Sequence, residues 1–187
     1  SAGQCTTDRL GVSSAILDGY LDVAGGCTSS DDCSTASGDV QYTLIDEYGN
    51  LTNGWNTGNA LPGSAVRAWG QLEAVGGTLY YIGGQTSTST DEQSIVYHTT
   101  GFTSGNPTWD SDGATNSLPA ARTKHSATVW NGRIYVAGGL DSSGTASNTV
   151  YVSPDQSAGG DIATAWTTST SFNVARFGAS LVGYNNN

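Results

Sequence analysis

The stretch that decides the fold reads Arg122-Thr-Lys-His-Ser-Ala-Thr-Val-Trp-Asn-Gly-Arg-Ile-Tyr-Val-Ala-Gly-Gly139. Two short runs rich in β-branched and aromatic residues flank Asn131-Gly132. Asn and Gly accept a positive φ at both central positions of a type I′ hairpin turn. The pattern therefore predicts a β-hairpin whose second strand stops at the glycine pair Gly138-Gly139.

The same pattern recurs along the chain, and an arginine opens each copy. These arginines are 58, 55 and 54 residues apart: Arg9, Arg67, Arg122 and Arg176. Nine and ten residues after each arginine stand turn-forming pairs: Asp18-Gly19, Gly76-Gly77, Asn131-Gly132 and Asn185-Asn186. Glycine pairs follow the first three hairpins: Gly25-Gly26, Gly83-Gly84 and Gly138-Gly139. The chain is therefore read as an internal repeat.

Each copy contains further runs of strand type. A third run lies at 40–42, 95–97 and 150–152. It is followed by a lone tryptophan in each copy: Trp55, Trp109 and Trp166. Nothing between these runs shows the 3.6-residue apolar spacing of a helix longer than one turn. The sequence therefore predicts an all-β protein with room for four strands in each repeat.

The hairpin, the glycine pair, the Val-x-Tyr strand, the Trp and then Leu118-Pro-Ala-Ala-Arg122 resemble the kelch repeat. The resemblance implies that each repeat forms one four-stranded antiparallel blade of a β-propeller. It also implies that the glycine pair allows close backbone approach and that Tyr and Trp pack between blades. It divides a single kelch-repeat region, 1–187, into repeat 1 (9–66), repeat 2 (67–121), repeat 3 (122–175) and a partial repeat (176–187). The His-Ser pair of many kelch repeats stands only at His125-Ser126.

About three blades and part of a fourth predict an incomplete or open propeller, because closed propellers use four to eight blades. The expected fourth turn, Asn185-Asn186, lies next to Asn187. Three explanations stay open: a piece of a longer chain, neighbouring copies that complete one another as an oligomer or fibre, or a misjudged repeat. Repeats bury their faces only against neighbours, so an isolated arc is expected to aggregate or oligomerise.

Charge and cysteine content bear on the compartment and the partners. The net charge of −10 disfavours nucleic acid and anionic membranes, and no apolar run approaches the ~20 residues of a membrane span. Cys27 and Cys33 are predicted to form a disulfide rather than remain two thiols, while Cys5 is expected to fill an apolar slot. The sequon at Asn50 is a glycosylation candidate. We expect an extracellular or cell-surface protein.

Motifs for catalysis are absent from the sequence, which contains no Walker loop, no H-E-x-x-H and no G-x-S-x-G. The histidines are His98 and His125. A kelch-type copper-radical oxidase would require a histidine pair, tyrosines and a cysteine cross-link at the propeller axis. We expect both histidines to be hydrogen-bonded structural residues. The sequence therefore predicts no catalytic residue, no metal ligand and no cofactor.

Acidic residues recur in the loop after each glycine pair: Asp31, Asp32 and Asp39; Asp91 and Glu92; and Asp141. They are candidates for a ligand-binding rim or for a calcium site built from oxygen ligands. The alternative is that they are solvated loop acids. No D-x-D-x-D-G ladder is present, which favours the solvated alternative over calcium.

The four repeated arginines could form a ring of cations aimed at an anionic ligand. A residue that every repeat needs is more simply structural, with its guanidinium bonded to carbonyls or carboxylates of the adjoining blade. We expect the structural role for the arginines. The same role is expected for the repeated glycine pairs and tryptophans.

Three functions follow from these observations. The first is a non-enzymatic extracellular or cell-surface kelch segment that mediates adhesion by binding protein or glycan through its inter-strand loops. The second is a structural subunit of a surface fibre assembled by blade stacking. The third is a fragment of a kelch-type oxidase or glycan-processing enzyme whose catalytic residues lie elsewhere. The expected partners are a protein or glycan ligand, or further blades or copies of the protein.

Overall fold

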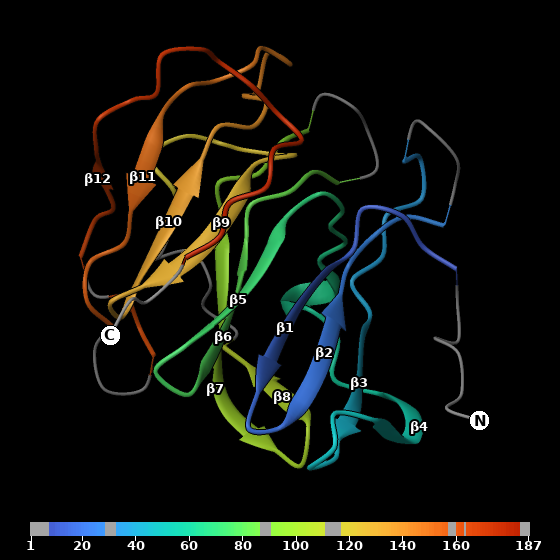
Figure 1. Cartoon of the computed structure of the whole chain (residues 1–187). Helices are drawn as coiled ribbons and strands as arrows, with labels where there is room; N and C mark the ends of the chain where they lie inside the picture. Colours follow the sequence, from blue (N-terminus) through green and yellow to red (C-terminus); the bar gives the residue numbers. More distant parts are fainter. Residues whose placement is uncertain are drawn as a thin grey trace.

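The structure is a computed structural model that describes residues 8–28, 33–86, 91–110, 117–156, 160–162 and 164–183. Strands in these residues form three four-stranded antiparallel sheets that follow one another around a common centre (Figure 1). Apart from the strands, the regular structure in this part of the chain is one 3-10 turn, η1 (Pro62–Ser64). Within the same residues, no helix has the length and apolar character of a membrane span.

The strands are distributed evenly among three blades. Blade 1 contains β1 (Ser13–Leu17), β2 (Tyr20–Ala24), β3 (Val40–Ile45) and β4 (Leu51–Thr57). Blade 2 contains β5 (Gln71–Val75), β6 (Thr78–Ile82), β7 (Val96–Thr103) and β8 (Asn106–Trp109). Blade 3 contains β9 (Ser126–Trp130), β10 (Arg133–Ala137), β11 (Val150–Val152) and β12 (Thr167–Thr168). Neighbours in sequence are neighbours in each sheet, so the prediction of four-stranded antiparallel blades is confirmed.

The first two strands of each blade form the predicted hairpins. Leu17 pairs with Tyr20 across the first turn, and the equivalent pairs close the other two. The turn residues have φ values of 49° and 80° at Asp18-Gly19, 61° and 81° at Gly76-Gly77, and 49° and 73° at Asn131-Gly132. Positive φ at both positions is the type I′ geometry. The fourth predicted turn, at 185–186, lies outside the described residues.

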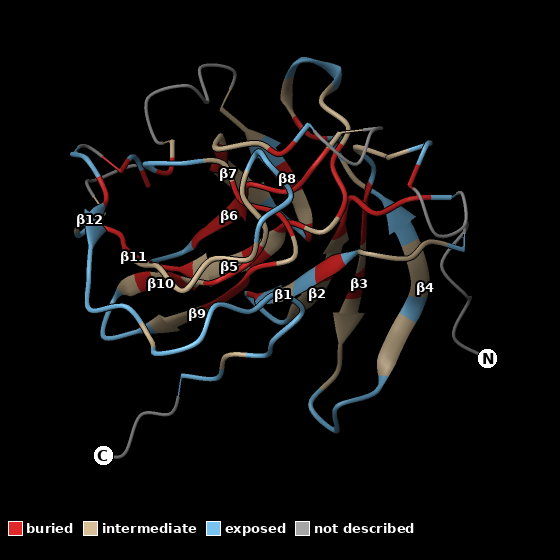
Figure 2. Cartoon of the chain, turned by 90° about the horizontal axis from the view of Figure 1, so that it is seen from above, coloured by how far each residue is buried: buried red, intermediate tan, exposed pale blue. Residues whose placement is uncertain are grey.

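The two larger clusters of buried residues in the described part of the chain form layers, one between each pair of successive blades. The layer between blades 1 and 2 includes Leu17, Ala24, Val40, Leu61, Leu72, Leu79, Tyr81 and Tyr97. The layer between blades 2 and 3 includes Val75, Tyr80, Ile82, Val96, Leu118, Ala127, Ile134, Val136, Tyr151, Ile162 and Trp166. Tyr80 and Tyr81 are adjacent on β6, so they point to opposite faces of blade 2, one into each layer. Figure 2 shows the buried residues concentrated along the strands between the sheets.

The repeated tryptophans pack toward the preceding blade. Trp109 lies against the layer between blades 1 and 2, and Trp166 belongs to the layer between blades 2 and 3. Trp55 occupies the equivalent position in blade 1, is only partly buried and belongs to neither layer. Trp55 has no such layer to pack into, because no described blade precedes blade 1.

Backbone atoms of the repeated arginines join each blade to the one before it. The carbonyl oxygens of Arg67, Arg122 and Arg176 accept hydrogen bonds from the second glycine of the preceding pair, at 2.8, 2.8 and 3.0 Å. A Cβ atom on the first glycine of each pair would lie 2.5, 2.6 and 2.6 Å from these same oxygens. Each first glycine also has a positive φ, at 70°, 57° and 68°. The glycine pairs therefore permit the close contact between blades.

The arginine side chains meet the expectation of bonds to an adjoining repeat only in part. Nη1 of Arg67 donates to Val66 O at 2.8 Å and Nη1 of Arg122 to Ala121 O at 2.7 Å, and these carbonyls end the preceding repeat. Nη2 of Arg67 donates to the hydroxyl of Tyr97 at 3.0 Å, and Nη2 of Arg122 donates to that of Tyr151 at 3.0 Å. Each guanidinium also lies over the ring of the same tyrosine, 5.5 and 5.2 Å from its centroid. The third strand of the same blade holds the side chain, because its tyrosine offers both a ring face and a hydroxyl.

Candidate functional site

The two ends of the blades carry different kinds of connection. Hairpin turns lie at one end. The opposite end, which we call the loop face, lies at the top of Figure 1. It carries the described parts of the connections that follow the glycine pairs, at 25–28 and 33–39, at 83–86 and 91–95, and at 138–149. Because the strands are antiparallel, every loop that follows a glycine pair must emerge on this face.

A chain of backbone hydrogen bonds runs across the centre of the loop face. It joins the residues that stand two positions after each arginine: Gly11, Trp69, Lys124 and Gly178, which we call the axial chain. Trp69 N donates to Gly11 O at 2.8 Å, Lys124 N to Trp69 O at 2.9 Å, and Gly178 N to Lys124 O at 2.8 Å. All four residues have a positive φ, at 66°, 59°, 52° and 64°. Equivalent residues of successive repeats therefore hold one another in the left-handed region.

A hollow of 480 Å³, which we call the axial mouth, is lined by the axial chain and its neighbours. The Trp69 ring packs on Gly11, where a Cβ would lie 2.7 Å from Trp69 Cδ2. Lys124 Nζ lies 5.3 Å from the centroid of the same ring. Phe177 and Val12 also line the hollow and are 55% and 40% exposed. The mouth therefore combines an aromatic and apolar surface with one ammonium group.

The charge of the axial mouth differs from that of the whole chain. The chain carries a net charge of −10, yet the residues lining the mouth include no Asp or Glu. Burial, reinforced by the charge of Arg122, lowers the pKa of His125 to about 3, so this histidine is neutral at physiological pH. Lys124, the single lysine of the sequence, therefore determines the sign of the charge at the mouth.

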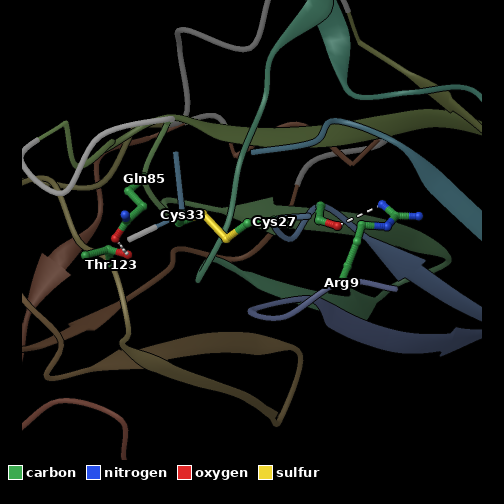
Figure 3. The surroundings of a disulfide bond; sticks show 6 residues. Arg9, Cys27, Cys33, Gln85 and Thr123 are labelled. Atoms are coloured by element: carbon green, nitrogen blue, oxygen red, sulfur yellow. Dashed lines mark hydrogen bonds between the residues drawn. A yellow bond between two sulfur atoms is a disulfide. The ribbon is translucent and has the colours of Figure 1, made fainter. Parts of the chain in front are cut away.

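The predicted disulfide is present beside this region. Cys27 and Cys33 are joined with their Cα atoms 5.3 Å apart, and both side chains are buried (Figure 3). Ala68 completes their cluster, and Leu10, Ala36 and Trp69 pack against it. The disulfide thus supports the first loop next to the Trp69 ring. The third cysteine, Cys5, lies outside the described residues.

The loop acids emerge on the loop face but bond within their own loops. Asp91 accepts hydrogen bonds from the hydroxyl of Thr86 and, at 2.8 Å, from Nε2 of Gln93. Asp39 is exposed, and its carbonyl accepts a hydrogen bond from Gly25 N at 3.0 Å. Asp31 and Asp32 lie outside the described residues.

Asp141 forms a local turn of the third loop. Its Oδ1 accepts hydrogen bonds from the Ser143 hydroxyl at 2.6 Å and from the Ser143 and Thr145 backbone at 2.9 and 3.0 Å. These bonds lower the pKa of the Asp141 carboxyl below its usual value. In the described part of the chain, no three His, Cys, Asp or Glu side chains are grouped as a metal site would require.

Glu92 differs from the other loop acids because it is buried. Its side chain is 7% exposed, and its carboxylate oxygens have no hydrogen-bond partner among the described residues. The backbone of Glu92 forms a β-bridge with Gln85, which turns the side chain inward. Glu92 is therefore not available on the loop rim.

His98 has structural surroundings. It is 2% exposed, its ring stacks on Tyr80 with centroids 6.2 Å apart, and its Nε2 lies 3.4 Å from Asp110 Oδ2.

Asn50 is exposed in the β3–β4 turn, away from the loop face. Its Nδ2 donates to Asp46 Oδ2 at 3.1 Å, and bonds from Asn50 lower the pKa of that carboxyl. A glycan on Asn50 would replace part of this contact.

Two comparisons with known proteins agree with the repeated four-stranded blades. The family model of the kelch motif matches residues 121–152. The chain contains a kelch repeat. Among solved structures, that of YjhT is similar, with a TM-score of 0.65 and 13% identity over 89% of this chain and 47% of YjhT. At this identity the similarity shows the fold alone, and the chain spans about half the length of YjhT. A search of curated proteins found no match.

Blade 3, which contains the matched kelch motif, carries a second candidate surface on the side away from blade 2. A hollow of 520 Å³ lies there between blade 3 and residues 181–183, which cover part of the blade surface, since Gly183 N donates to Thr128 Oγ1 at 2.6 Å. We call the blade residues that line this hollow the open face: Thr128, Trp130, Tyr135, Ala137 and Val150. Trp130 is 47% exposed, whereas its repeat equivalents Leu17 and Val75 are 8% exposed. The open face therefore presents the positions that blades 1 and 2 bury against a following kelch blade.

The residues of the axial mouth were not among the sites expected from the sequence. The signal that could have found them is the alignment of the kelch repeats on their arginines. That alignment places Gly11, Trp69, Lys124 and Gly178 at one position. Two glycines at a shared position indicate a left-handed backbone, and a Trp and a Lys at the same position then stand out as exceptions.

Proposed function

We propose that this chain is part of a non-enzymatic kelch propeller that acts in adhesion, outside the cell or at its surface, by binding a protein or glycan ligand on the loop face. The observation that carries the proposal is a rigid repeated frame that presents three unequal loops and the axial mouth on one face. Loops positioned by a rigid scaffold are common sites of binding. The Cys27–Cys33 disulfide supports an oxidising compartment.

The test uses glycan and peptide arrays probed with the purified chain, followed by surface variants measured against any ligand that binds. Asp39→Arg and Ser143→Arg place bulky charges in two exposed positions of the loop face. Tyr48→Arg places the same group on an 82% exposed side chain in the β3–β4 turn at the opposite end. We expect at least one loop-face variant to weaken binding and the Tyr48 variant to leave it unchanged. Blank arrays, or a loss confined to the Tyr48 variant, would contradict the proposal.

A second function, a structural subunit assembled by blade stacking, is favoured by the open face of blade 3. Its apolar side chains match positions that blades 1 and 2 bury against a neighbour, so another blade could cover them. Stacking in a constant direction would produce filaments. Electron microscopy of the native material is the test, and dispersed particles without a periodic repeat would count against a fibre.

A further inference from the structure

Backbone geometry does not explain why a Trp and a Lys occupy the axial chain. Gly11 and Gly178 adopt φ values of 66° and 64°, which glycine accepts without a Cβ penalty. Trp69 and Lys124 adopt nearly the same conformation, at 59° and 52°. A left-handed conformation at a non-glycine residue costs of order 1 kcal/mol and concentrates at functional sites. Glycine would satisfy the backbone conformation at this position, so the two side chains must serve another purpose, which for Trp69 includes packing beside the disulfide.

The apolar part of the axial mouth is open to a ligand. Trp69 is only partly buried, Phe177 is 55% exposed and Val12 is 40% exposed, and all three line the same hollow. A volume of 480 Å³ lies within the range of sites that enclose small ligands. A flat apolar group could enter and exclude water from these side chains.

The polar part of the axial mouth favours one negative charge. Lys124 supplies the only cationic side chain among the lining residues that is exposed to the hollow, and no lining residue is acidic. An ammonium beside apolar surface forms a stronger hydrogen bond to a carboxylate than one that is fully hydrated. The mouth is therefore suited to an anion that also carries an apolar group.

Few side chains of the mouth could bind hydroxyl groups. Gln71 Nε2 already donates to Gly70 O at 3.0 Å, and the ring nitrogens of His125, although they have no hydrogen-bond partner among the described residues, belong to a side chain that is only 3% exposed. A saccharide would need partners for several hydroxyls on entering such a site, because unpaired polar groups are costly to desolvate. A peptide end with one carboxylate and one ring matches the lining better.

We propose that the axial mouth binds a carboxylate next to an aromatic ring, as presented by the carboxyl-terminal aromatic residue of a peptide. The ring lies against Phe177 and the exposed part of Trp69, and the carboxylate accepts a hydrogen bond from Lys124 Nζ. This assignment rests on the proposed function and narrows it to a protein ligand.

The test is calorimetric titration of the whole chain with N-acetyl-phenylalaninate. The matched neutral probe is N-acetyl-phenylalaninamide, which keeps the ring and removes the charge. We expect a dissociation constant on the order of 0.1–1 mM for the carboxylate, given its size. We expect the amide to bind roughly tenfold or more weakly, because it lacks the charge-assisted bond to Lys124.

Lys124→Gly removes the ammonium and leaves a residue that accepts the φ of 52°. Trp69→Gly removes the indole ring and likewise leaves a residue that accepts the φ of 59°. Both variants should keep the circular dichroism spectrum of the parent and lose roughly tenfold or more in carboxylate affinity. The control is Arg133→Ala, which removes an exposed cation elsewhere and should not change the affinity.

Equal binding of the two probes, or unchanged affinity in Lys124→Gly, would overturn the assignment of the axial mouth. Tighter binding of glucuronate than of N-acetyl-phenylalaninate would replace the peptide by an acidic saccharide and also overturn it. Array ligands whose binding depends on Asp39 or Ser143 but not on Lys124 would leave the proposed function standing without this site. Blank arrays together with Lys124-dependent binding of the carboxylate probe would leave the axial mouth standing as a binding site and would contradict the proposed function.

Discussion

The carbonyl oxygen of Arg67 lies 2.5 Å from the position that a Cβ atom would occupy on Gly25. The same relationship joins Gly83 to Arg122 and Gly138 to Arg176, at 2.6 Å in both cases. The contact is between backbone atoms of successive repeats, so neither partner can move away without separating the blades. The glycine pair is therefore a requirement of blade packing as well as of strand ending.

Gly83→Ala should destabilise the chain much more than Gly132→Ala. Both glycines have a positive φ, at 57° and 73°, so both variants pay a backbone penalty of about 1 kcal/mol. A Cβ on Gly83 also meets the Arg122 oxygen, whereas one on Gly132 has no atom within 4 Å. We expect a total loss of about 3 kcal/mol or more for Gly83→Ala in urea unfolding. Equal losses for the two variants would show that the close approach is unimportant.

Arg122→Lys should also be destabilising, although it keeps the charge. Arg122 is 5% exposed and donates to Ser147 Oγ and to the Tyr151 hydroxyl at 3.1 and 3.0 Å. A lysine cannot reproduce this planar set of donors, so we expect a loss of about 2 kcal/mol. Arg133→Lys is the control, because that arginine forms an exposed ion pair with Asp155 and should change stability by less than about 1 kcal/mol. Chemical denaturation compares the two, and a similar effect at both positions would contradict the structural role of Arg122.

Stability should fall as the pH rises from 4 toward 8. Asp22 is 0% exposed, and burial raises the pKa of its carboxyl to about 7, from 3.8. Burial likewise raises the pKa of Glu73 to about 7. Between the unfolded pKa values of 3.8 and 4.5 and the folded values near 7, the folded chain holds two carboxyl protons that the unfolded chain releases, which lowers stability as the pH rises. The buried, neutral His125 offsets one of these two effects below about pH 6.5, because there only the unfolded histidine binds a proton, so the net change is still a decrease.

Asp22→Asn separates this effect from other titrations. We expect it to raise the free energy of unfolding by roughly 1–3 kcal/mol at pH 8, where the buried carboxylate is charged, and to have little effect at pH 4.5. Denaturation of parent and variant at both pH values measures the difference. A variant that is equally or more destabilised at pH 8 would rule out the buried charge as the cause.

Reduction of the Cys27–Cys33 disulfide should lower stability by about 2 kcal/mol, the scale expected for closing a short loop. Both half-cystines are almost fully buried next to Ala68, so the reduced thiols would keep some packing. A Cys27→Ala/Cys33→Ala variant supplies the comparison. Reductant should lower the melting temperature of the parent and leave that of the double variant unchanged. A parent melting temperature that does not respond to reductant would contradict this expectation.

Trp130→Glu should reduce self-association of the isolated chain. Trp130 is 47% exposed on the open face, at the position where blades 1 and 2 have buried Leu17 and Val75. A charge placed there opposes burial against another blade. Light scattering over a concentration series measures the effect, with Tyr48→Glu as a control on an 82% exposed side chain far from this face. An unchanged mass distribution in the Trp130 variant would exclude the open face as the contact.

The blades could be predicted because their signals are local. Asn131-Gly132 favours a type I′ turn, and the alternating run before Gly138-Gly139 favours a strand, whatever lies elsewhere in the chain. Recurrence at similar spacing then indicated one sheet for each repeat. The Cys27–Cys33 pairing could also be predicted, since the two cysteines are six positions apart in the sequence.

The amino-acid sequence alone determined the number of described sheets, their antiparallel topology and their hairpin turns, because these depend on backbone preferences within a few residues. Only the tertiary structure brought Lys124 over Trp69, since the two come from different repeats and meet through the angle between blades. It also decided that Asp22 and Glu92 are buried and that Arg67 and Arg122 donate to the hydroxyls of Tyr97 and Tyr151 in their own blades. Which polar side chains are buried, and what they bond to, depends on which surfaces of the three blades pack together, and residues distant in the sequence decide that.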